Sequence, residues 1–181
     1  MKRSDYTKYQ KMALGYFDKA KIALSEEEKG RIEIVDEGLN DFERTGLAIL
    51  IYVNTDYYCA KEMVMLPGQT CAEHVHAPLP DKHYFGKQET FRCRFGKVYL
   101  YVAGEETPCR ACTPPDGHYT VFHEIVLNPG EQYTIVPNTL HWFQAGPEGA
   151  VISEFSTPSH DEYDLFTNPN IQRMTVIEED E

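Results

Sequence analysis

The sequence predicts a mainly β, single-domain protein whose strands form an antiparallel sandwich or barrel, with short helices at the N-terminus. Four apolar, β-rich runs of four or five residues are each bounded by Gly, Pro or Asn: Ile49–Val53, Glu62–Leu66, Val98–Val102 and Tyr133–Val136. No helical pattern separates these runs, so parallel strands joined by helices are not expected. A length of 181 residues fits one domain. We expect the barrel to occupy residues 47–175.

Residues 1–46 precede the barrel and are expected to form a helical segment that packs on it. Residues 1–30 are rich in Lys, Ala, Leu, Glu and Met, most of which favour helices. Ser25 and Glu28 have the spacing in which each side chain binds the other residue's free backbone amide at the start of a helix. One or two short helices are therefore predicted here.

Two other segments lack a strand or helix pattern. Residues 104–117 contain three prolines and little periodicity, which indicates a loop. Residues 176–181 end in an acidic run and form a tail that is expected to be solvated.

The charge balance limits the kind of partner. The chain has 29 acidic against 17 basic residues, a formal net charge of −12. Nucleic acids and anionic membranes require a basic face, so neither is expected as a partner. The longest apolar run, Leu47–Val53, is too short to cross a bilayer, and no signal peptide follows the N-terminal basic residues. An odd number of cysteines, five, does not suggest a disulfide framework, so a cytoplasmic protein with reduced thiols is predicted.

His74 and His76 are the first candidates for chemistry. Side chains two residues apart on a strand share a face, so both imidazoles can point into the barrel. Glu89 begins an alternating run that puts Glu89, Phe91 and Cys93 on one face. A carboxylate that points into an apolar interior is costly unless a cation balances it. A divalent metal ion would balance Glu89 and bind both imidazoles.

A second block repeats part of this pattern. Gly130 is followed, after five residues, by the run Val136–His141, as Gly68 is followed after five residues by His74. The two blocks resemble the two motifs of the cupin superfamily, whose small antiparallel barrels of the jelly-roll type hold a metal ion. The resemblance implies one ligand set, with two His and one Glu from the first motif and one His from the second: His74, His76, Glu89 and His141.

Two departures from the cupin pattern stand out. Twelve residues separate His76 from Glu89, more than the common motif has, which indicates an inserted loop at the barrel mouth, residues 77–88. Val136 and Asn138 stand where Pro and Gly are usual, and Asn tolerates the left-handed conformation that Gly would supply.

The stretches around the expected ligands carry a narrower resemblance. Pro67–His74, Gly86–Cys93 and Asn138–Gly146 resemble the D-lyxose isomerases, metal-dependent cupins that interconvert D-lyxose with D-xylulose and often D-mannose with D-fructose. The similarity runs from Leu47 to the C-terminal region and includes Tyr52–Asp56. It implies a Mn²⁺-preferring cytoplasmic ketol-isomerase that acts on a small sugar and is commonly a homodimer. Three nitrogen ligands and one oxygen ligand suit Mn²⁺ and its transition-metal neighbours better than Ca²⁺ or Mg²⁺.

Such a reaction also needs a base. A sugar offers its carbonyl and adjacent hydroxyl to the ion, which acts as a Lewis acid while a base carries a proton between C1 and C2 through an enediol. If Gly146–Gly149 is a four-residue hairpin loop, His141 faces Glu154 on the paired strand, on the same side of the sheet. We therefore expect Glu154 to be the general base. The alternative is that Glu154 accepts a hydrogen bond from His141 and orients its ring.

Further side chains are expected around the substrate. Lys82 and Lys87 lie in or beside the inserted loop, where a cation could hold sugar hydroxyls or stabilise the charge of an enediolate. Lys87 stands two residues before Glu89 and shares its face, so it is the preferred catalytic cation. Tyr99 and Tyr101 share one strand face and are expected to contact the sugar, with packing in the core as an equal alternative.

Two rival functions are considered, and the first of them would use the same four ligands. A cupin dioxygenase would bind iron and require an apolar O₂ pocket. A non-catalytic sugar-binding cupin would bind sugar without forming a ketose and would have little need for Glu154 at the metal. The fold alone does not choose among the three functions.

Overall fold

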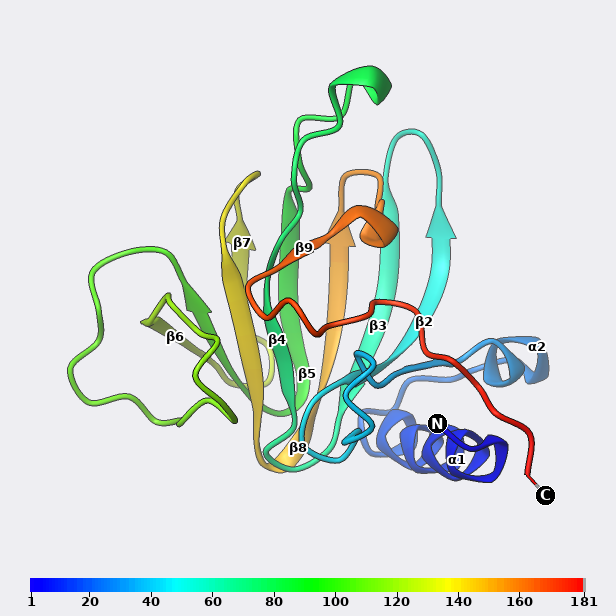
Figure 1. The fold of residues 1–181 in the computed structure, drawn as a ribbon. Coiled ribbons are helices and arrows are strands. Elements are labelled where there is room, and N and C mark those ends of the chain that lie inside the picture. Colours follow the sequence, from blue (N-terminus) through cyan, green and yellow to red (C-terminus); the bar gives the residue numbers. More distant parts are fainter. Residues whose placement is uncertain (181) are drawn as a thin grey trace.

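The computed structural model describes residues 1–180 and contains one curled antiparallel sheet with two N-terminal helices (Figure 1). The helices are α1 (Arg3–Lys19) and α2 (Glu26–Gly30). The strands are β1 (Glu33–Val35), β2 (Leu47–Asn54), β3 (Cys59–Met65), β4 (Thr70–Val75), β5 (Glu89–Val102), β6 (His123–Leu127), β7 (Gln132–Ile135), β8 (His141–Ser156) and β9 (Leu165–Phe166). Short 3₁₀ turns occur at Pro80–Lys82 and Asp161–Tyr163. The predicted mainly β, antiparallel barrel is confirmed.

The two longest strands, β5 and β8, form the body of the barrel. They pair along their length, and His141 pairs with the end of β5 farthest from Glu89. Straight strands would hold these two residues roughly 40 Å apart at ~3.3 Å per residue, yet Glu89 Oε1 lies 3.1 Å from His141 Nε2. The strand pair is therefore folded back on itself. Its halves form facing walls of the barrel, where the rings of Phe91 and Phe143 meet with centroids 5.0 Å apart.

Glycines allow this fold to bend. The pairing of β5 with β8 shifts register on both sides of Phe95. Gly96 and Gly149 meet at the bend with φ of +70° and +79°. A Cβ on Gly96 would overlap the carbonyl oxygen of Gly149, so only glycine fits there.

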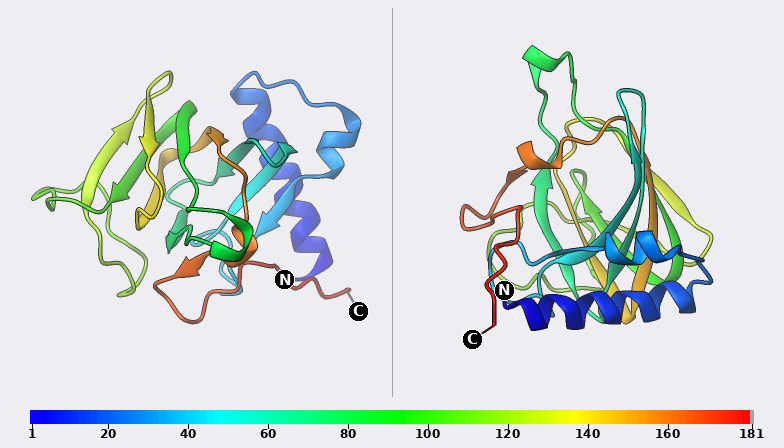
Figure 2. Two further views of the ribbon diagram at one scale, coloured as in Figure 1. Left: turned by 90° about the horizontal axis from the view of Figure 1, so that it is seen from above. Right: turned by 90° about the vertical axis from the view of Figure 1, so that its right-hand side faces the viewer.

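The N-terminal segment packs on the outside of the barrel. Ser25 and Glu28 form the expected capping box at α2. Helix α1 runs along one end of the barrel (Figure 2) and buries Ala13, Tyr16 and Phe17 against residues of β1, β2, β3 and β8. The helical pattern ends at Gly30, and β1 then joins the edge of the sheet beside β2. The sheet thus begins before residue 47, earlier than predicted.

The chain ends lie together. Arg3 pairs with Glu179 at 2.9 Å, and the backbone and hydroxyl of Ser4 donate to Asp180 at 2.9 and 2.8 Å. The acidic tail is exposed as expected, but its described part is tied to the start of α1; Glu181 lies outside the described residues. None of the helices described here is long and apolar enough to cross a membrane.

Two connections shape the open end of the barrel. The inserted loop between β4 and β5 projects above the sheet and carries the 3₁₀ turn at Pro80–Lys82 (Figure 1). After β8 the chain returns toward β4, where β9 pairs with it. On the way, Asp161 and Asp164 enter the interior.

Candidate metal centre

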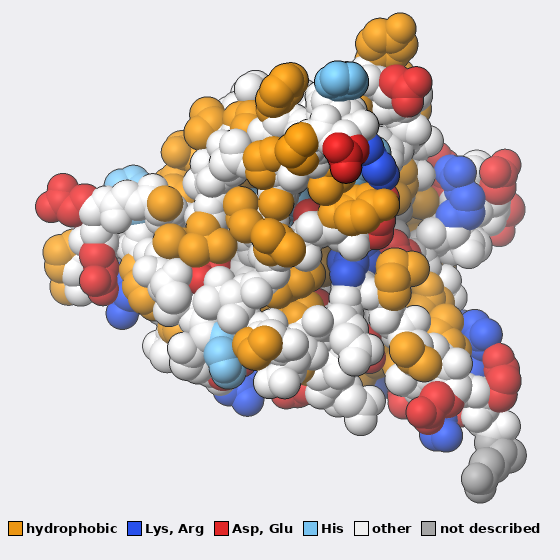
Figure 3. Space-filling model, turned by 45° about the horizontal axis from the view of Figure 1, so that its top comes forward, with side chains coloured by type: hydrophobic (Ala, Val, Ile, Leu, Met, Phe, Trp, Pro, Cys, Tyr) orange, Lys and Arg blue, Asp and Glu red, His pale blue; other side chains and the backbone are white. Residues whose placement is uncertain are grey.

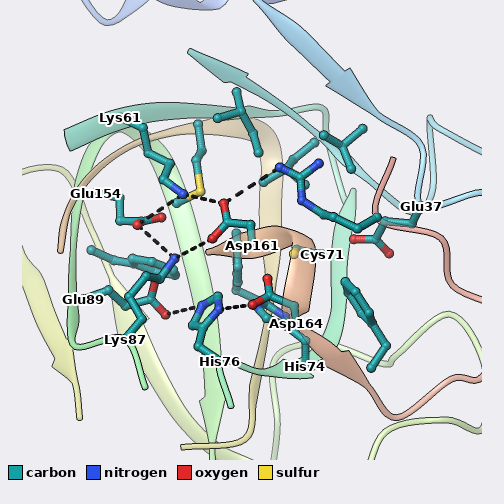
Figure 4. A pocket seen from close by; sticks show the side chains of 18 residues that line it. Glu37, Lys61, Cys71, His74, His76, Lys87, Glu89, Glu154, Asp161 and Asp164 are labelled. Carbon is teal, nitrogen blue, oxygen red and sulfur yellow. Dashed lines mark hydrogen bonds and ion pairs between the residues drawn. The ribbon is translucent and has the colours of Figure 1, made fainter. Parts of the chain in front are cut away.

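A pocket inside the barrel collects most of the residues singled out above (Figure 4). Both His74 and His76 come from β4 or its C-terminal end, Glu89 begins β5, and His141 begins β8. All four side chains are buried. The fold-back of β5 and β8 is what brings Glu89 and His141 to the same point.

The three histidines turn the same nitrogen toward one another. In each ring Nδ1 has a partner: the carbonyl of Ala72 for His74 at 2.8 Å, and the carbonyl of Thr139 for His141 at 2.9 Å. For His76 the partner is the Asp164 carboxylate, at 2.5 Å. Partners of this kind hold Nδ1 as the donor and leave the lone pair on Nε2. One ligand atom from each ring lies within 4.8 Å of the others.

Glu89 completes the group. Its Oε1 lies 3.2 Å from His76 Nε2 and 3.1 Å from His141 Nε2. These three atoms have no hydrogen-bond partner among residues 1–180. Buried polar atoms are rarely left without partners, and a divalent cation would satisfy all of them at once. The residues present therefore fit the metal ion that the sequence implied.

The pocket also holds a dense set of buried charges. They are three cations and five carboxylates: Lys61, Lys87, Arg173, Glu37, Glu89, Glu154, Asp161 and Asp164. Their formal charges leave two negative charges in excess. A divalent cation would balance that excess, which agrees with the donor set of the histidine cluster.

Lys87 is central to these charges. Its Nζ lies 2.9 Å from Glu89 Oε2, 3.1 Å from Glu154 Oε1 and 3.3 Å from Asp161 Oδ1. Burial by itself would lower the pKa of Lys87, but Asp161, Glu154 and Glu89 raise it well above its usual value. For Glu89, burial favours the neutral acid, whereas Lys87 and His76 hold its pKa well below the usual range. Lys87 is thus a fixed cation and not a base.

Glu154 lies in the pocket, as predicted, but the hairpin argument that placed it there was wrong. Residues 146–149 do not turn β8 back to pair with itself: Glu154 is paired with Phe91 of β5 and Lys61 of β3. The bend of the β5–β8 pair instead sets Glu154 and His141 on facing walls. Glu154 is 2% exposed, and its Oε1 forms ion pairs with Lys87 at 3.1 Å and Lys61 at 3.5 Å.

The alternative role for Glu154, orienting His141, does not match the contacts. His141 Nδ1 is held by the carbonyl of Thr139, and its Nε2 faces Glu89. Glu154 instead lies beside two ammonium groups, those of Lys61 and Lys87.

Three expected substrate contacts do not lie in the pocket. Lys82 is exposed on the inserted loop, where its Nζ donates to the hydroxyl of Tyr163 at 3.2 Å. Tyr101 is buried outside the barrel wall, stacked on Trp142 with centroids 4.0 Å apart. Tyr99 packs against the same aromatic cluster. For both tyrosines the packing alternative holds.

The strand bend explains the position of the tyrosines. Phe91 and Cys93 face the core in the first half of β5. Beyond the two register shifts, Val98, Leu100 and Val102 face it. Alternation from Glu89 therefore assigns the second half of β5 to the wrong face.

Sequence reasoning missed five charged residues of the pocket: Glu37, Lys61, Asp161, Asp164 and Arg173. A signal existed for Lys61, because it alternates with Met63 and Met65, which are buried in the core. The other four lie in irregular segments, where alternation predicts no direction.

Comparisons with known proteins agree with the geometry of the pocket. The sequence model of D-lyxose isomerase matches residues 112–181. A D-lyxose/D-mannose isomerase of Thermosediminibacter oceani is 59% identical over 182 aligned positions, which cover 99% of each chain. The chain belongs to the D-lyxose isomerase family. A D-lyxose ketol-isomerase of Cohnella laeviribosi is 55% identical, with 91% of each chain covered.

Solved structures support the fold. The L-ribose isomerase of Acinetobacter sp. DL28, crystallised with L-ribose, superposes with a TM-score of 0.81 at 15% identity and covers 98% of both chains. The L-ribose isomerase of Cellulomonas parahominis, without ligand, gives a TM-score of 0.73 at 15% identity with the same coverage. At such identity the likeness concerns the fold alone, so the chemistry is argued from the pocket and from the family.

Proposed function

We propose that the protein is a metal-dependent aldose–ketose isomerase that interconverts D-lyxose and D-xylulose, and also D-mannose and D-fructose. The relatives at 55–59% identity carry names for this activity. The observation that carries the proposal is the convergence of three imidazoles and one carboxylate oxygen beside Glu154 and Lys87 in a buried pocket.

We infer that His74, His76, Glu89 and His141 hold the ion and that it is Mn²⁺. The mixed set of nitrogen and oxygen ligands suits a first-row transition metal. Burial and the neighbouring rings of His141 and His76 lower the pKa of His74 well below its usual value, which keeps the His74 ring neutral and able to bind a metal. When bound, the ion supplies Lewis-acid polarisation of the sugar carbonyl.

Glu154 is the proposed general base. Its carboxylate lines the pocket with Oε1 3.1 Å from Lys87 Nζ, so it can take a proton from one of the two reacting carbons and return it to the other. Lys87, a fixed cation 3.1 Å from Glu154, stabilises negative charge that develops on the sugar oxygens in the enediolate. Lys87 and Glu154 are almost fully buried, which strengthens both effects.

The direct test uses metal-stripped protein incubated with D-lyxose without O₂, with and without added Mn²⁺. D-xylulose should form only when Mn²⁺ is present. Turnover that requires iron and O₂ would favour the dioxygenase. Saturable sugar binding without any ketose would favour the sugar-binding cupin.

We also propose that the protein is a homodimer and that it is cytoplasmic. Exposed apolar side chains gather around the open end of the molecule (Figure 3), and Phe85 of the inserted loop is 78% exposed there. Apolar surface of this kind supports a homodimer, which light scattering at micromolar concentration would detect. All five cysteines are free thiols, which supports a cytoplasmic location.

A further inference from the structure

Glu37 is a buried carboxylate for which the proposed chemistry has no use. It lies in the loop after β1, is 1% exposed, and lines the pocket on the side away from Glu154 (Figure 4). The same pocket is lined by the apolar Val35, Leu47 and Met63 and by the charged Arg173 and Asp164. Glu37 thus adds hydrogen-bond acceptors to the side of the pocket that lies opposite Glu154.

The partners of Glu37 leave much of its capacity free. Its oxygens accept from the amide of Ala72 at 3.2 and 3.3 Å, and the thiol of Cys71 is the other neighbour that bonds to it. No cation within residues 1–180 forms an ion pair with it. Arg173, which lines the same pocket, is bound to Glu33 at 2.9 Å. A carboxylate has about four acceptor positions, so positions remain for a ligand.

The backbone also sets Glu37 apart. Its φ of +54° lies in the left-handed region, which is uncommon for a residue with a Cβ. The amide of Gln172 donates to the carbonyl of Glu37 at 2.9 Å and pins this conformation. Burial raises the pKa of Glu37 to about 7, since neither the amide nor the thiol compensates for lost water. Strained, poorly compensated groups of this kind are typical of ligand sites.

We propose that Glu37 is a specificity-determining residue that accepts hydrogen bonds from the hydroxyls of the sugar chain remote from the reacting carbons. The inference rests on the proposed function: with C1 and C2 near Glu154, the rest of the chain extends toward the opposite side of the pocket, where Glu37 lies. The ligand class is a neutral polyol chain with hydroxyls at C4 and C5.

The test compares Mn²⁺-loaded wild type with Glu37→Gln on D-lyxose and on its 4-deoxy and 5-deoxy analogues. The variant should lose about tenfold or more in kcat/KM for D-lyxose, mainly through KM, because a charge-assisted hydrogen bond is lost. For at least one deoxy analogue the ratio of variant to wild type should stay near one. The three sugars differ in the fraction present in each ring form, but the ratio compares two proteins on the same sugar, so this difference cancels.

Equal losses on all three sugars, or no loss on any, would overturn the inference. If the wild type isomerises none of them, the proposed function itself fails, which is a distinct result. Asp36→Asn is the matched control: Asp36 is 3% exposed but binds Thr175 and the Gly38 amide outside the pocket, so no sugar-selective change is expected. Should Glu37→Gln fold poorly, Glu37→Asp keeps the charge, withdraws it from the pocket and should give the same selective loss.

Discussion

Replacement of Lys61 by Met should destabilise the protein strongly, although Lys61 binds neither the metal nor, in our account, the sugar. Its Nζ lies 2.7 Å from Asp161 Oδ2 and 3.5 Å from Glu154 Oε1, and its side chain is 2% exposed. With an effective dielectric constant of ~20 these attractions amount to roughly 6 and 5 kcal/mol before desolvation is subtracted. Loss of the ammonium leaves both carboxylates buried beside Lys87, and breaking such a pair costs about 3–5 kcal/mol.

Urea denaturation in saturating Mn²⁺ measures this loss. With a slope of about 2 kcal/mol per molar urea, the unfolding midpoint of Lys61→Met should fall by about 2 M. Lys29→Met is the matched control, because Lys29 lies only 2.6 Å from Glu26 but in solvent, and an exposed pair contributes about 0.5 kcal/mol or less. Adding Asp161→Asn to Lys61→Met should recover part of the loss. Equal losses for Lys61→Met and Lys29→Met would refute the reasoning.

Four further predictions concern pH, metal, the bend and the reaction. The pKa of Glu37 is raised from 4.5 in the unfolded chain to about 7 in the folded protein, so its ionisation destabilises the fold increasingly between pH 4.5 and 7 and by a constant amount above 7. Relative to wild type, Glu37→Gln should therefore gain roughly 3 kcal/mol of unfolding free energy between pH 4 and 9, and a difference that does not change with pH would contradict this. Mn²⁺ at about a hundred times its Kd should raise the unfolding free energy of the wild type by about 2.7 kcal/mol. His141→Ala should abolish this stabilisation, and stabilisation of the variant by Mn²⁺ would argue against His141 as a ligand. Gly149→Ala should lower the unfolding free energy measured in urea by about 2 kcal/mol or more, because its Cβ would lie 2.7 Å from the carbonyl oxygen of Met65. Gly117→Ala, whose Cβ would have no atom within 4 Å, should lower it little. Equal losses for the two variants would contradict the role of Gly149 in the bend of the β5–β8 pair. Turnover of D-lyxose in deuterated water should place deuterium at C1 of D-xylulose by mass spectrometry or NMR, and product that is always unlabelled would speak against proton transfer by a base that exchanges with solvent.

Local patterns predicted the parts of the fold that depend on local chemistry. The capping box at Ser25 and Glu28, the antiparallel strands and the inserted loop all follow from residue type and spacing. The pairing of β1 with β2 does not, because a three-residue strand has too short an alternation to recognise.

The cluster of His74, His76, Glu89 and His141 was predictable because these residues lie at or near strand ends with fixed spacing, and the cupin resemblance joined them into one set. The rest of the pocket depends on how the β5–β8 pair bends and how the chain returns after β8. Because of the bend, Tyr101 points away from the barrel interior, opposite to what alternation from Glu89 predicts. The bend also places Glu154 opposite His141, although the two residues are not paired across a hairpin. The charges of Asp161 and Asp164 come from an irregular segment whose path is set only by tertiary contacts.

In the proposed mechanism one pocket holds both the metal and a separate base, Glu154. The most direct measurement is the Mn²⁺ content and the kcat for D-lyxose of a single preparation of Glu154→Gln. Because Glu154 is not among the four proposed ligands, the variant should bind one equivalent of Mn²⁺, as the wild type should. Its kcat should fall by about 10²–10⁴-fold, the usual contribution of a general base. Full Mn²⁺ content with a kcat close to that of the wild type would contradict the account.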